Sequence, residues 1–375
     1  MEVRGYYLTH ILAAVFPACA GVLLYGWRGA VTVVGVVGSA AAALVIWRRI
    51  GPRGRTLHYS HAIWFALLLA LMLPAELASA GAPGGVAPWP IIPLAGLLVV
   101  ILLWMLGGMG GGYVHPVIAA YLLMIFCFEP MLIPHRILNR DHVAAGDLFH
   151  SSVPDSRTLL AQPWISRLHN ESDATYQEPA AEVLVNYTSG RASPARRQWL
   201  PLYGLLRDSM PPLEDFVIAG QPGPLGASSV IAVVIGGLFL LYRGLVDFRI
   251  PLIGCVAAYA ALLILPIPSV IANEPVWHWM PIRTADIGRA VGITFVNYEI
   301  MVSPLIFTAF FLATAPSIRP MTRRGRAVFA FVFGITAAAF QLYVSVAYGP
   351  YLALLIVSLL TPELDRWFKV KPLVG

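Results

Sequence analysis

Long apolar runs recur along almost the whole of this 375-residue sequence, separated by short polar or Gly/Pro-rich stretches. Runs of about 18 residues or more are long enough for an α-helix to cross about 30 Å of hydrocarbon. Hydrophobic residues make up 58% of the chain, charged residues make up 12%, and the mean hydropathy is +0.74. Soluble domains carry roughly 25% charged residues. The sequence therefore predicts an all-α integral membrane protein surrounded by a lipid bilayer.

The apolar runs and their breakers predict about ten transmembrane helices in two groups of five. The expected spans lie near 8–27, 29–47, 60–78, 88–106, 114–133, 226–243, 250–272, 290–316 with an interruption, 326–346 and 348–361. One long polar stretch of about ninety residues separates the groups. We therefore divide the chain into a first membrane half (1–133), an extramembrane loop segment (134–225) and a second membrane half with a C-terminal tail (226–375).

The positive charges predict the orientation of the helices. With the N-terminus in the cytoplasm, fourteen Lys and Arg residues fall at the cytoplasmic side, and the short loops of the opposite side hold only Arg28, Arg283 and Arg289. Short cytoplasmic loops carry the excess of Lys and Arg in membrane proteins. We expect a bacterial inner-membrane protein with both termini cytoplasmic and segment 134–225 outside. The net charge of +6 sits in clusters between apolar runs, so no nucleic-acid partner is expected.

An odd number of spans in each half means that the second half enters the membrane from the opposite face, as in inverted repeats. Such repeats place binding sites near the bilayer midplane, where broken helices point their ends at a ligand. Two Gly-rich breaks, 107–112 and 220–226, precede the fifth and sixth spans. Each break frees backbone N–H groups for an anionic ligand. The alternative is a tight turn with close helix packing by small residues.

Acidic residues within or beside spans are candidates for an ion path because charge inside a membrane is costly. Glu76, Glu129 and Glu299 are such residues, and His115 before Pro116 is a further ionisable candidate. Glu76 and Glu129 lie near the outer ends of their spans, where a carboxylate can also simply reach water. Glu299 lies deeper, within the interrupted eighth span.

Histidine and cysteine spacing predicts no metal centre. His58 and His61 are the one close histidine pair in or beside a span, and no matched partner for a haem is identifiable. Cys19, Cys127 and Cys255 lie far apart inside expected spans without a CxxC pair. We interpret these cysteines as core residues.

Four segments, in order along the chain, resemble the family formed by the D subunit of the Rnf complex and the B subunit of the sodium-translocating NADH:quinone oxidoreductase. Residues 68–74 resemble the family's "LLLALxLP", and residues 107–116 resemble "GGLGxNPFNPA". Residues 220–229 resemble "GxxPGSxGETS", and residues 310–325 resemble "FFMATDPVTxPxTxxG". The resemblance covers most of the membrane body. Three positions depart from it: His115 replaces the last asparagine, Ala227 a glutamate and Ala315 an aspartate.

The resemblance implies a flavin. Family members carry FMN joined by a phosphoester to a threonine in a "DGxSGAT"-like sequence on the outer side. Ser172 and Thr175 match the end of that motif, while His169 and Asp173 replace its leading aspartate and a following Gly or Gln. Thr188 is the alternative attachment residue, although it lacks the preceding alanine.

The family also holds a non-covalent riboflavin or second flavin in the membrane body. The resemblance and the helix-start position together select the Gly-rich turn before the sixth span as a contributor to that site. The candidate residues are Gly220, Pro222, Gly223, Gly226, Ser228 and Ser229.

The resulting hypothesis is a membrane flavoprotein subunit of an electron-transfer complex that couples electron flow to Na⁺ or H⁺ translocation. Its partners would be other membrane and peripheral subunits, including iron–sulfur and flavin proteins, because the chain has no cluster cysteines or nucleotide motif of its own. Two alternatives remain open: an inverted-repeat transporter or channel without redox chemistry, and a membrane anchor for redox partners without its own flavin.

Overall fold

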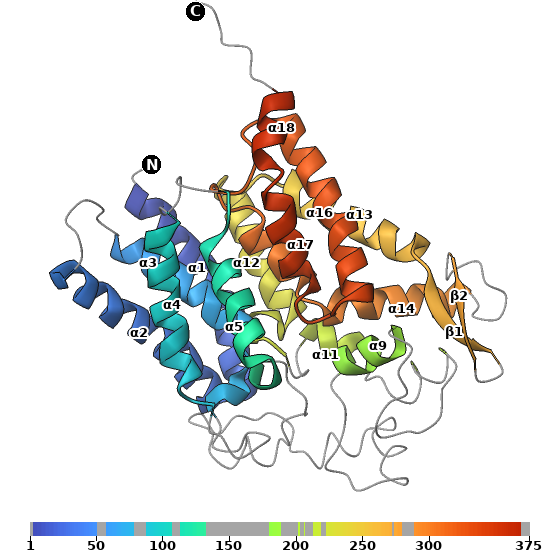
Figure 1. Cartoon of the computed structure of the whole chain (residues 1–375), viewed down its shortest axis with the longest axis horizontal. Helices are drawn as coiled ribbons and strands as arrows, with labels where there is room; N and C mark the ends of the chain where they lie inside the picture. Colours follow the sequence, from blue (N-terminus) through green and yellow to red (C-terminus); the bar gives the residue numbers. More distant parts are fainter. Residues whose placement is uncertain are drawn as a thin grey trace, which may run out of the picture.

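The computed structural model describes residues 3–50, 58–78, 88–106, 113–132, 180–188, 202, 206, 213–218, 223–271, 274–279 and 289–368. These residues are mostly helical, as the sequence predicts, and form two groups of helices that lie side by side (Figure 1). The start of α1 and helix α18 lie at one end of the bundle, and α9 and α11 lie at the other.

The first group, coloured blue to teal, contains five α-helices and one short 3₁₀ helix. They are α1 (Val3–Tyr25), α2 (Trp27–Ile50), α3 (Tyr59–Met72), η1 (Ala75–Ala78), α4 (Ile91–Met105) and α5 (Pro116–Leu132). Gly26 joins α1 to α2 with φ of 61°, a left-handed conformation that glycine adopts without a steric penalty.

The second group contains the remaining long helices and follows two short ones, α9 (Ala180–Thr188) and α11 (Leu213–Ile218). Its elements are η2 (Leu225–Ala227), α12 (Val230–Tyr242), α13 (Arg249–Ile264), α14 (Arg289–Val302), α15 (Leu305–Phe307), η3 (Thr308–Leu312), α16 (Arg323–Tyr343), α17 (Gly349–Ser358) and α18 (Thr361–Trp367). The last of these, α18, lies beyond the expected tenth span, in the segment assigned to the C-terminal tail.

Three of the described helices are long and apolar enough to cross a membrane alone: α1, α2 and α16. The bent pair α14 and α15–η3 would make a fourth, and six further apolar helices have 10–17 residues. The positions of all these helices agree with the expected spans. α3 is shorter than expected for 60–78, because Pro74 follows its end and η1 continues in another direction; its 14 residues rise about 21 Å.

Apolar side chains cover the outward faces of the helices. Exposed examples on α1, α2, α12 and α13 are Leu8, Leu12, Val34, Ile46, Leu238, Leu252 and Val256. Contiguous apolar surface of this extent is rare on monomeric soluble proteins but is the expected surface of a helix bundle in lipid. Cys19 of α1 and Cys127 of α5 are also exposed, so their interpretation as core residues is wrong.

The second and fourth long helices pack closely in each half. A side chain at Gly96 of α4 would meet Ser39 and the backbone of Val36 on α2. A side chain at Gly334 of α16 would meet the backbone of Gly254 on α13 and lie 2.8 Å from the Ala258 nitrogen. Both helix pairs therefore depend on a glycine that lets the backbones approach.

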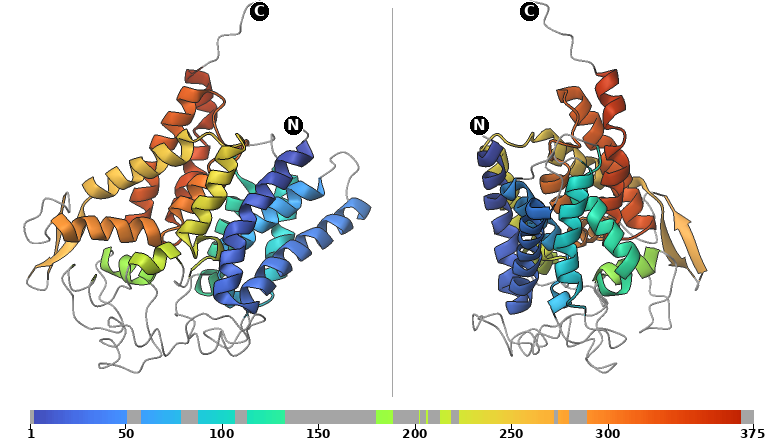
Figure 2. Two further views of the ribbon diagram at one scale, coloured as in Figure 1. Left: turned by 180° about the vertical axis from the view of Figure 1, so that it is seen from behind. Right: turned by 60° about the vertical axis from the view of Figure 1, so that its left-hand side comes forward.

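The two halves meet through matching helices (Figure 2). α1 packs against α12, where a Cβ on Gly236 would lie 2.6 Å from the carbonyl oxygen of Ala13. α5 packs against α17, where the rings of Tyr121 and Tyr351 form an edge-to-face pair with centroids 4.9 Å apart. The first helix of one half thus contacts the first helix of the other, and the last contacts the last.

One short hairpin, which the sequence did not predict, interrupts the otherwise helical described residues. Strands β1 (Ile267–Ile271) and β2 (Glu274–His278) form an antiparallel hairpin within and after the expected span 250–272. α13 ends at Ile264 because the next residue, Leu265, precedes Pro266 and is extended, with φ of −61° and ψ of 142°. A residue before proline is disfavoured in the helical region, and proline cannot donate the helical hydrogen bond.

The expected interruption of the eighth span is confirmed. α14 and the α15–η3 segment are bent by 57° at Ser303 and Pro304. η3 is a π-helical turn in which the N–H of Ala313 donates to the carbonyl oxygen of Thr308 at 2.8 Å. Breaks of this kind leave backbone groups outside the regular helical ladder, which membrane proteins tolerate where protein or a cavity surrounds them.

Candidate functional site

The Gly-rich turn before α12 lies at the junction of the two halves. The N–H of Leu225 donates to the carbonyl oxygen of Leu73 at 3.0 Å, and Pro74 and Pro224 form an isolated bridge beside this bond. A Cβ on Gly21 of α1 would lie 2.8 Å from the Leu225 carbonyl oxygen. The segments 68–74 and 220–229, recognised as separate motifs in the sequence, therefore meet at one seam in the structure.

Gly226 is enclosed at this seam. A Cβ on it would lie 2.7 Å from the Cβ of Leu71 and 3.1 Å from the Phe307 ring, closer than real side-chain contacts allow. The turn thus brings the end of α3 against α15, and a larger residue would force these helices apart. Gly223 differs, because no atom lies within 4 Å of the position its Cβ would take.

The two serines of the turn bond to its own backbone. Ser228 Oγ donates to the carbonyl oxygen of Leu225 at 2.8 Å. Ser229 caps α12, its Oγ accepting the N–H of Ala232 at 3.4 Å. The described part of the turn therefore has the geometry of the tight turn with close helix packing that the sequence offered as an alternative. Flavin contacts by Gly223, Gly226, Ser228 and Ser229 stay a prediction.

Four predicted flavin residues lie outside the described residues: Ser172, Thr175, Gly220 and Pro222. The alternative attachment residue, Thr188, is described at the end of α9 and is buried. Its hydroxyl donates to the carbonyl oxygens of Leu184 at 3.0 Å and Val185 at 3.3 Å. FMN could be attached to that oxygen only if the hydroxyl lost these hydrogen bonds and the side chain became exposed. The geometry therefore disfavours Thr188 as the flavin attachment residue.

The three acidic candidates lie in separate places. The backbone of Glu76 lies in η1, and its side chain is not among the described side chains. Glu129 is exposed near the end of α5, next to Phe128, whose non-helical backbone (φ −135°, ψ 32°) marks a kink. Glu299 is fully buried in α14, one turn before the break. The structure does not bring Glu299 together with Glu129.

Glu299 has a hydrogen-bond partner that the sequence did not reveal. Nε2 of Gln341, a fully buried side chain of α16, donates to the carboxylate Oε2 of Glu299 at 2.7 Å and to its backbone oxygen at 2.6 Å. Glu299 Oε1 and Gln341 Oε1 are both buried and have no hydrogen-bond partner among the residues that the structure describes. Only proximity in the fold reveals this pair, because the two residues are 42 positions apart and no local pattern links them.

A second buried polar group gathers where α1, α3 and α5 begin. The Tyr7 and His61 rings stack with centroids 4.7 Å apart, and the His10 and Trp64 rings meet edge-on at 5.1 Å. The Phe65 and His115 rings contact each other at a tilt, with centroids 5.0 Å apart. We call Tyr6, Tyr7, His10, His61, Trp64, Phe65 and His115 the histidine–aromatic cluster. The sequence singled out His61 and His115 separately but did not predict that they share one interior.

Five polar atoms of the histidine–aromatic cluster are buried and have no partner among the described residues. His10 Nδ1 donates to the carbonyl oxygen of Tyr6 at 3.0 Å, which fixes its tautomer. The buried atoms without a partner are Tyr6 Oη, His61 Nε2, Trp64 Nε1, His115 Nδ1 and His115 Nε2. Buried polar groups are almost always hydrogen-bonded, so this concentration needs a ligand or water to satisfy it.

The unpartnered polar atoms of the cluster are of the kinds that the polar edge of an isoalloxazine ring bonds to. Such a ring offers a flat apolar face for stacking and a polar edge of carbonyl oxygens and an N–H. Trp64 and Tyr6 supply donors, and His61 and His115 supply either a donor or an acceptor, depending on tautomer. A bound ring would require the side chains to rotate apart, because their centroids already lie about one ring-stacking distance from each other.

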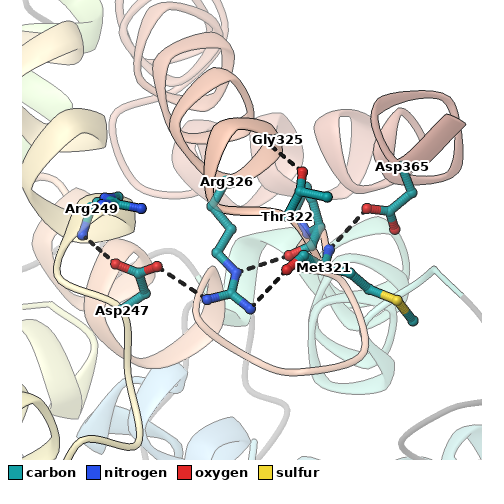
Figure 3. A network of polar contacts seen from close by, with 8 residues as sticks. Asp247, Arg249, Met321, Thr322, Gly325, Arg326 and Asp365 are labelled. Carbon is teal, nitrogen blue, oxygen red and sulfur yellow. Dashed lines mark hydrogen bonds and ion pairs between the residues drawn. The ribbon is translucent and has the colours of Figure 1, made fainter. Parts of the chain in front are cut away.

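The last part of the family-like segment 310–325 forms the turn and cap that precede α16 (Figure 3). Thr322 caps α16, its Oγ1 accepting the N–H of Gly325 at 3.0 Å. The Arg326 guanidinium donates to the carbonyl oxygens of Pro320 at 2.9 Å and Met321 at 3.2 Å. The family-like Pro, Thr and Gly spacing is therefore the turn and cap that begin α16.

Arg326 also ties this turn to the loop between α12 and α13. Its Nη1 lies 3.1 Å from Asp247 Oδ2, and the Arg249 N–H donates to Asp247 Oδ1 at 3.2 Å (Figure 3). Partial burial raises the pKa of Asp247, but the hydrogen bonds from Arg249 and Arg326 outweigh it and the pKa lies below its usual value. Asp365 adds a bond from α18, its Oδ1 accepting the N–H of Met321 at 2.8 Å.

Comparison with known proteins gives a match along the whole chain. Residues 1–373 match the NQR2, RnfD, RnfE family. The D subunit of the ion-translocating oxidoreductase complex of Halorhodospira halophila is 27% identical over 375 residues, which cover 96% of this chain and 89% of that protein.

Two further relatives are similar. The D subunit of the Na⁺-translocating ferredoxin:NAD⁺ oxidoreductase complex of Acetobacterium woodii is 22% identical, over 96% of this chain and 88% of its own length. The D subunit of the proton-translocating ferredoxin:NAD⁺ oxidoreductase complex of Clostridium ljungdahlii is 26% identical over 39% of this chain and 38% of its own length. The resemblance found in the four motifs is confirmed, and this chain, a membrane protein of apolar helices, belongs to the NQR2, RnfD, RnfE family.

Proposed function

We propose that this chain is the membrane subunit of an ion-translocating oxidoreductase complex, where it carries electrons through bound flavin. The observation that carries the proposal is the family match over residues 1–373, because a match of that extent includes the whole membrane body and not one motif. The relatives are subunits of complexes named for Na⁺ or proton translocation. The chain therefore works with other subunits, which include iron–sulfur and flavin proteins, and is not catalytic alone.

The proposed membrane arrangement is ten crossings in two inverted halves. The pairing of α1 with α12 and of α5 with α17 supports it, because a two-fold axis between two repeats brings equivalent helices together. The glycine contacts of Gly96 and Gly334 support it too, since each joins the fourth helix of a half to the second. In this arrangement the short helices α3, α12 and α17 cross with the help of adjoining non-helical segments.

The proposed orientation has both termini in the cytoplasm of a bacterium and segment 134–225 outside the inner membrane. The start of α1 and helix α18 lie at the same end of the bundle, and α9 and α11 lie at the opposite end, which supports it (Figure 1). Reporter fusions at residues 175 and 368 test it. Alkaline phosphatase should be active at 175 and inactive at 368, and the reverse pattern would contradict the orientation.

Two flavins are proposed. FMN is joined to Thr175 in the external segment, where a hydroxyl flanked by Ala174 matches the family's attachment motif. A non-covalent riboflavin or second flavin binds in the membrane body, and the unpartnered polar atoms of the histidine–aromatic cluster support placing its ring near His61 and His115. A flavin suits either place because it exchanges one or two electrons while the protein positions and tunes it.

The test of the function is co-purification and transport. The chain, tagged at its C-terminus and purified from its native membranes, should bring other subunits with it. Inverted membrane vesicles from the same cells should accumulate Na⁺ or protons when electrons are supplied, and vesicles from cells with Thr175→Ala should lose most of this uptake. A chain that purifies alone and vesicles that retain uptake without it would contradict the proposal.

The alternative function is a transporter, channel or anchor without its own flavin. The replacement of two family acids by Ala227 and Ala315 favours it, since the chain lacks those charges at the seam and near η3. Chromophore content separates the functions, because the alternative predicts no flavin in a correctly assembled sample.

A further inference from the structure

The pair formed by Glu299 and Gln341 has an unmet requirement that a cation would satisfy. Both side chains are fully buried, and Gln341 Nε2 already donates to Glu299 twice. Two oxygen atoms of the pair, one from the carboxylate and one from the amide, have no donor within the described part of the chain. A buried acceptor without a donor destabilises the folded protein, and an unpaired buried charge does so more strongly.

The orientation of the Gln341 amide is fixed by its contacts. Both short contacts of its Nε2 are to oxygen atoms, the carboxylate Oε2 and the backbone oxygen of Glu299. Exchanging the amide nitrogen and oxygen would set oxygen against two oxygens, so the free atom of Gln341 is its oxygen.

The helix ends around the pair add negative potential. Glu299 lies in the last turn of α14, which ends at Val302, and Gln341 lies in the last turn of α16, which ends at Tyr343. The C-terminal end of a helix carries partial negative charge and carbonyl groups without helical partners. Discontinuous membrane helices use such ends to coordinate Na⁺. Two of these carbonyls are already bonded. That of Glu299 accepts the Ser303 N–H at 3.3 Å and Gln341 Nε2 at 2.6 Å, and that of Ile300 accepts the Ser303 hydroxyl at 3.4 Å.

We propose that Glu299 and Gln341 form a binding site for a single monovalent cation, Na⁺, at the break between α14 and α15. A hard cation takes oxygen ligands, and this site offers the two free side-chain oxygens together with carbonyl oxygens of the α14 C-terminus. One carboxylate balances one positive charge. A divalent ion such as Ca²⁺ takes about six to eight oxygen ligands, usually with several carboxylates among them, so the single carboxylate suits a monovalent ion better.

This inference rests on the proposed function, since it supplies an ion site to a subunit proposed to act in ion translocation. The site is in the second half, on the α14–α15 break, and is separate from the histidine–aromatic cluster of α1, α3 and α5. It also differs from the two family positions that hold Ala227 and Ala315 in this chain. A Na⁺ site at Glu299 would therefore place a carboxylate for the ion at a new position of the fold.

The experiment is a Na⁺ titration of the purified full-length protein with its co-purifying subunits, in detergent at fixed pH. Choline chloride keeps the ionic strength constant, and the thermal unfolding midpoint is followed. A ligand that binds only the folded state raises that midpoint in a saturable way. We expect a rise of about 2 °C or more with Na⁺, and a smaller rise with K⁺ at the same concentration. Equilibrium filtration with ²²Na⁺ should find bound ion that unlabelled Na⁺ displaces.

The variants assign the effect to the pair. Glu299→Gln keeps the side-chain size and removes the charge, and it should abolish the Na⁺-specific shift and the displaceable ²²Na⁺. Gln341→Leu removes one oxygen ligand and should weaken Na⁺ binding at least tenfold. Glu363→Gln is the matched control, because Glu363 is an exposed carboxylate of α18 paired with Arg366, and it should respond to Na⁺ like the unaltered protein. If Glu299→Gln does not fold, Gln341→Leu and the filtration assay still decide.

Equal responses to Na⁺, K⁺ and choline, or an unchanged Na⁺ response in Glu299→Gln, would overturn the site. A Glu299 carboxyl that simply holds a proton gives the first of these results. Flavin and subunit content, measured on the same sample, separate the two proposals: flavin and partners without a Na⁺ response remove only this inference. A Na⁺ response without flavin or partners removes only the proposed function.

Discussion

The two membrane halves pack alike but bury different polar groups. In each half a glycine of the fourth helix, Gly96 or Gly334, lies against the second helix. The first half encloses histidine, tryptophan and tyrosine side chains, which suit a flat aromatic ligand. The second half encloses a carboxylate and an amide beside a helix break. The shared packing therefore encloses two different polar groups, a cluster of histidine and aromatic rings in the first half and a carboxylate–amide pair in the second.

The largest expected effect tests the shared packing. Gly334→Leu should unfold the protein or cost roughly 3 kcal/mol or more, because the new side chain would meet the α13 backbone at Gly254 and Ala258. Gly96→Leu should behave similarly on α2. Gly38→Leu is the control, since nothing lies within 4 Å of the place its Cβ would take. Folded yield by size-exclusion chromatography in detergent measures all three, and normal yield for Gly334→Leu would break the comparison between the halves.

A smaller effect tests whether Glu299 and Gln341 act as a unit. Gln341→Leu should cost about 2 kcal/mol of stability, because it leaves the buried carboxylate of Glu299 without its amide donor. The double variant Glu299→Leu/Gln341→Leu should recover part of that loss, because replacing both members of a buried polar pair is milder than removing one. Unfolding midpoints in detergent give both values at one Na⁺ concentration. Additive losses in the double variant would show that the two residues are not coupled.

The histidine–aromatic cluster predicts a selective effect on non-covalent flavin. His115→Leu should weaken flavin retention about tenfold, equal to about 1.4 kcal/mol, while the protein stays folded. His58→Leu should retain flavin, because His58 is exposed at the start of α3. Acid extraction followed by flavin fluorescence measures the extractable pool. Unchanged retention in His115→Leu would remove the cluster as the ring site and leave the non-covalent flavin to the Gly-rich turn.

The smallest effect concerns the polar network at the end of the bundle. Asp247→Asn should cost about 0.5 kcal/mol near pH 7, since the ion pair with Arg326 is partly exposed. The folded-state pKa of Asp247 is lowered, so its contribution exists above the unfolded pKa of about 3.9 and is lost as pH falls through the folded value. The unfolding midpoints of the two proteins should therefore converge as the pH falls below the folded-state pKa of Asp247. A gap that widens on acidification would contradict the ion pair.

The sequence predicted the positions of the apolar helices well because hydropathy and its breakers are local properties. The run at 88–106 corresponds to α4, and the break in 290–316 corresponds to the bend after α14. The hairpin β1–β2 was missed because the apolar residues around 267–271 continue the hydropathy of α13. Pro266 was the signal that could have ended the helix at Ile264.

The candidate site was harder to predict because its residues come from different helices. The sequence pointed to His61 and His115 separately. Only the packing of α3 against α5 shows that the Phe65 ring contacts both of them. Gln341 gave no signal, since an isolated glutamine in an apolar helix has no periodic partner. The sequence pointed to Glu299 because it is a charged residue within an expected span, whereas only the fold shows that Gln341 is its hydrogen-bond partner. Family resemblance located the motif at 310–325. The structure shows that Thr322 of this motif caps α16 by accepting the N–H of Gly325.

The most direct measurement of the central claim is the flavin content of the purified protein, resolved into covalent and extractable fractions. Denaturing electrophoresis with in-gel fluorescence should show flavin on the chain, and Thr175→Ala should abolish that band. Acid extraction of the same variant should still release flavin from the membrane body. A correctly assembled protein with no flavin in either fraction would contradict the account and leave a transporter, channel or anchor.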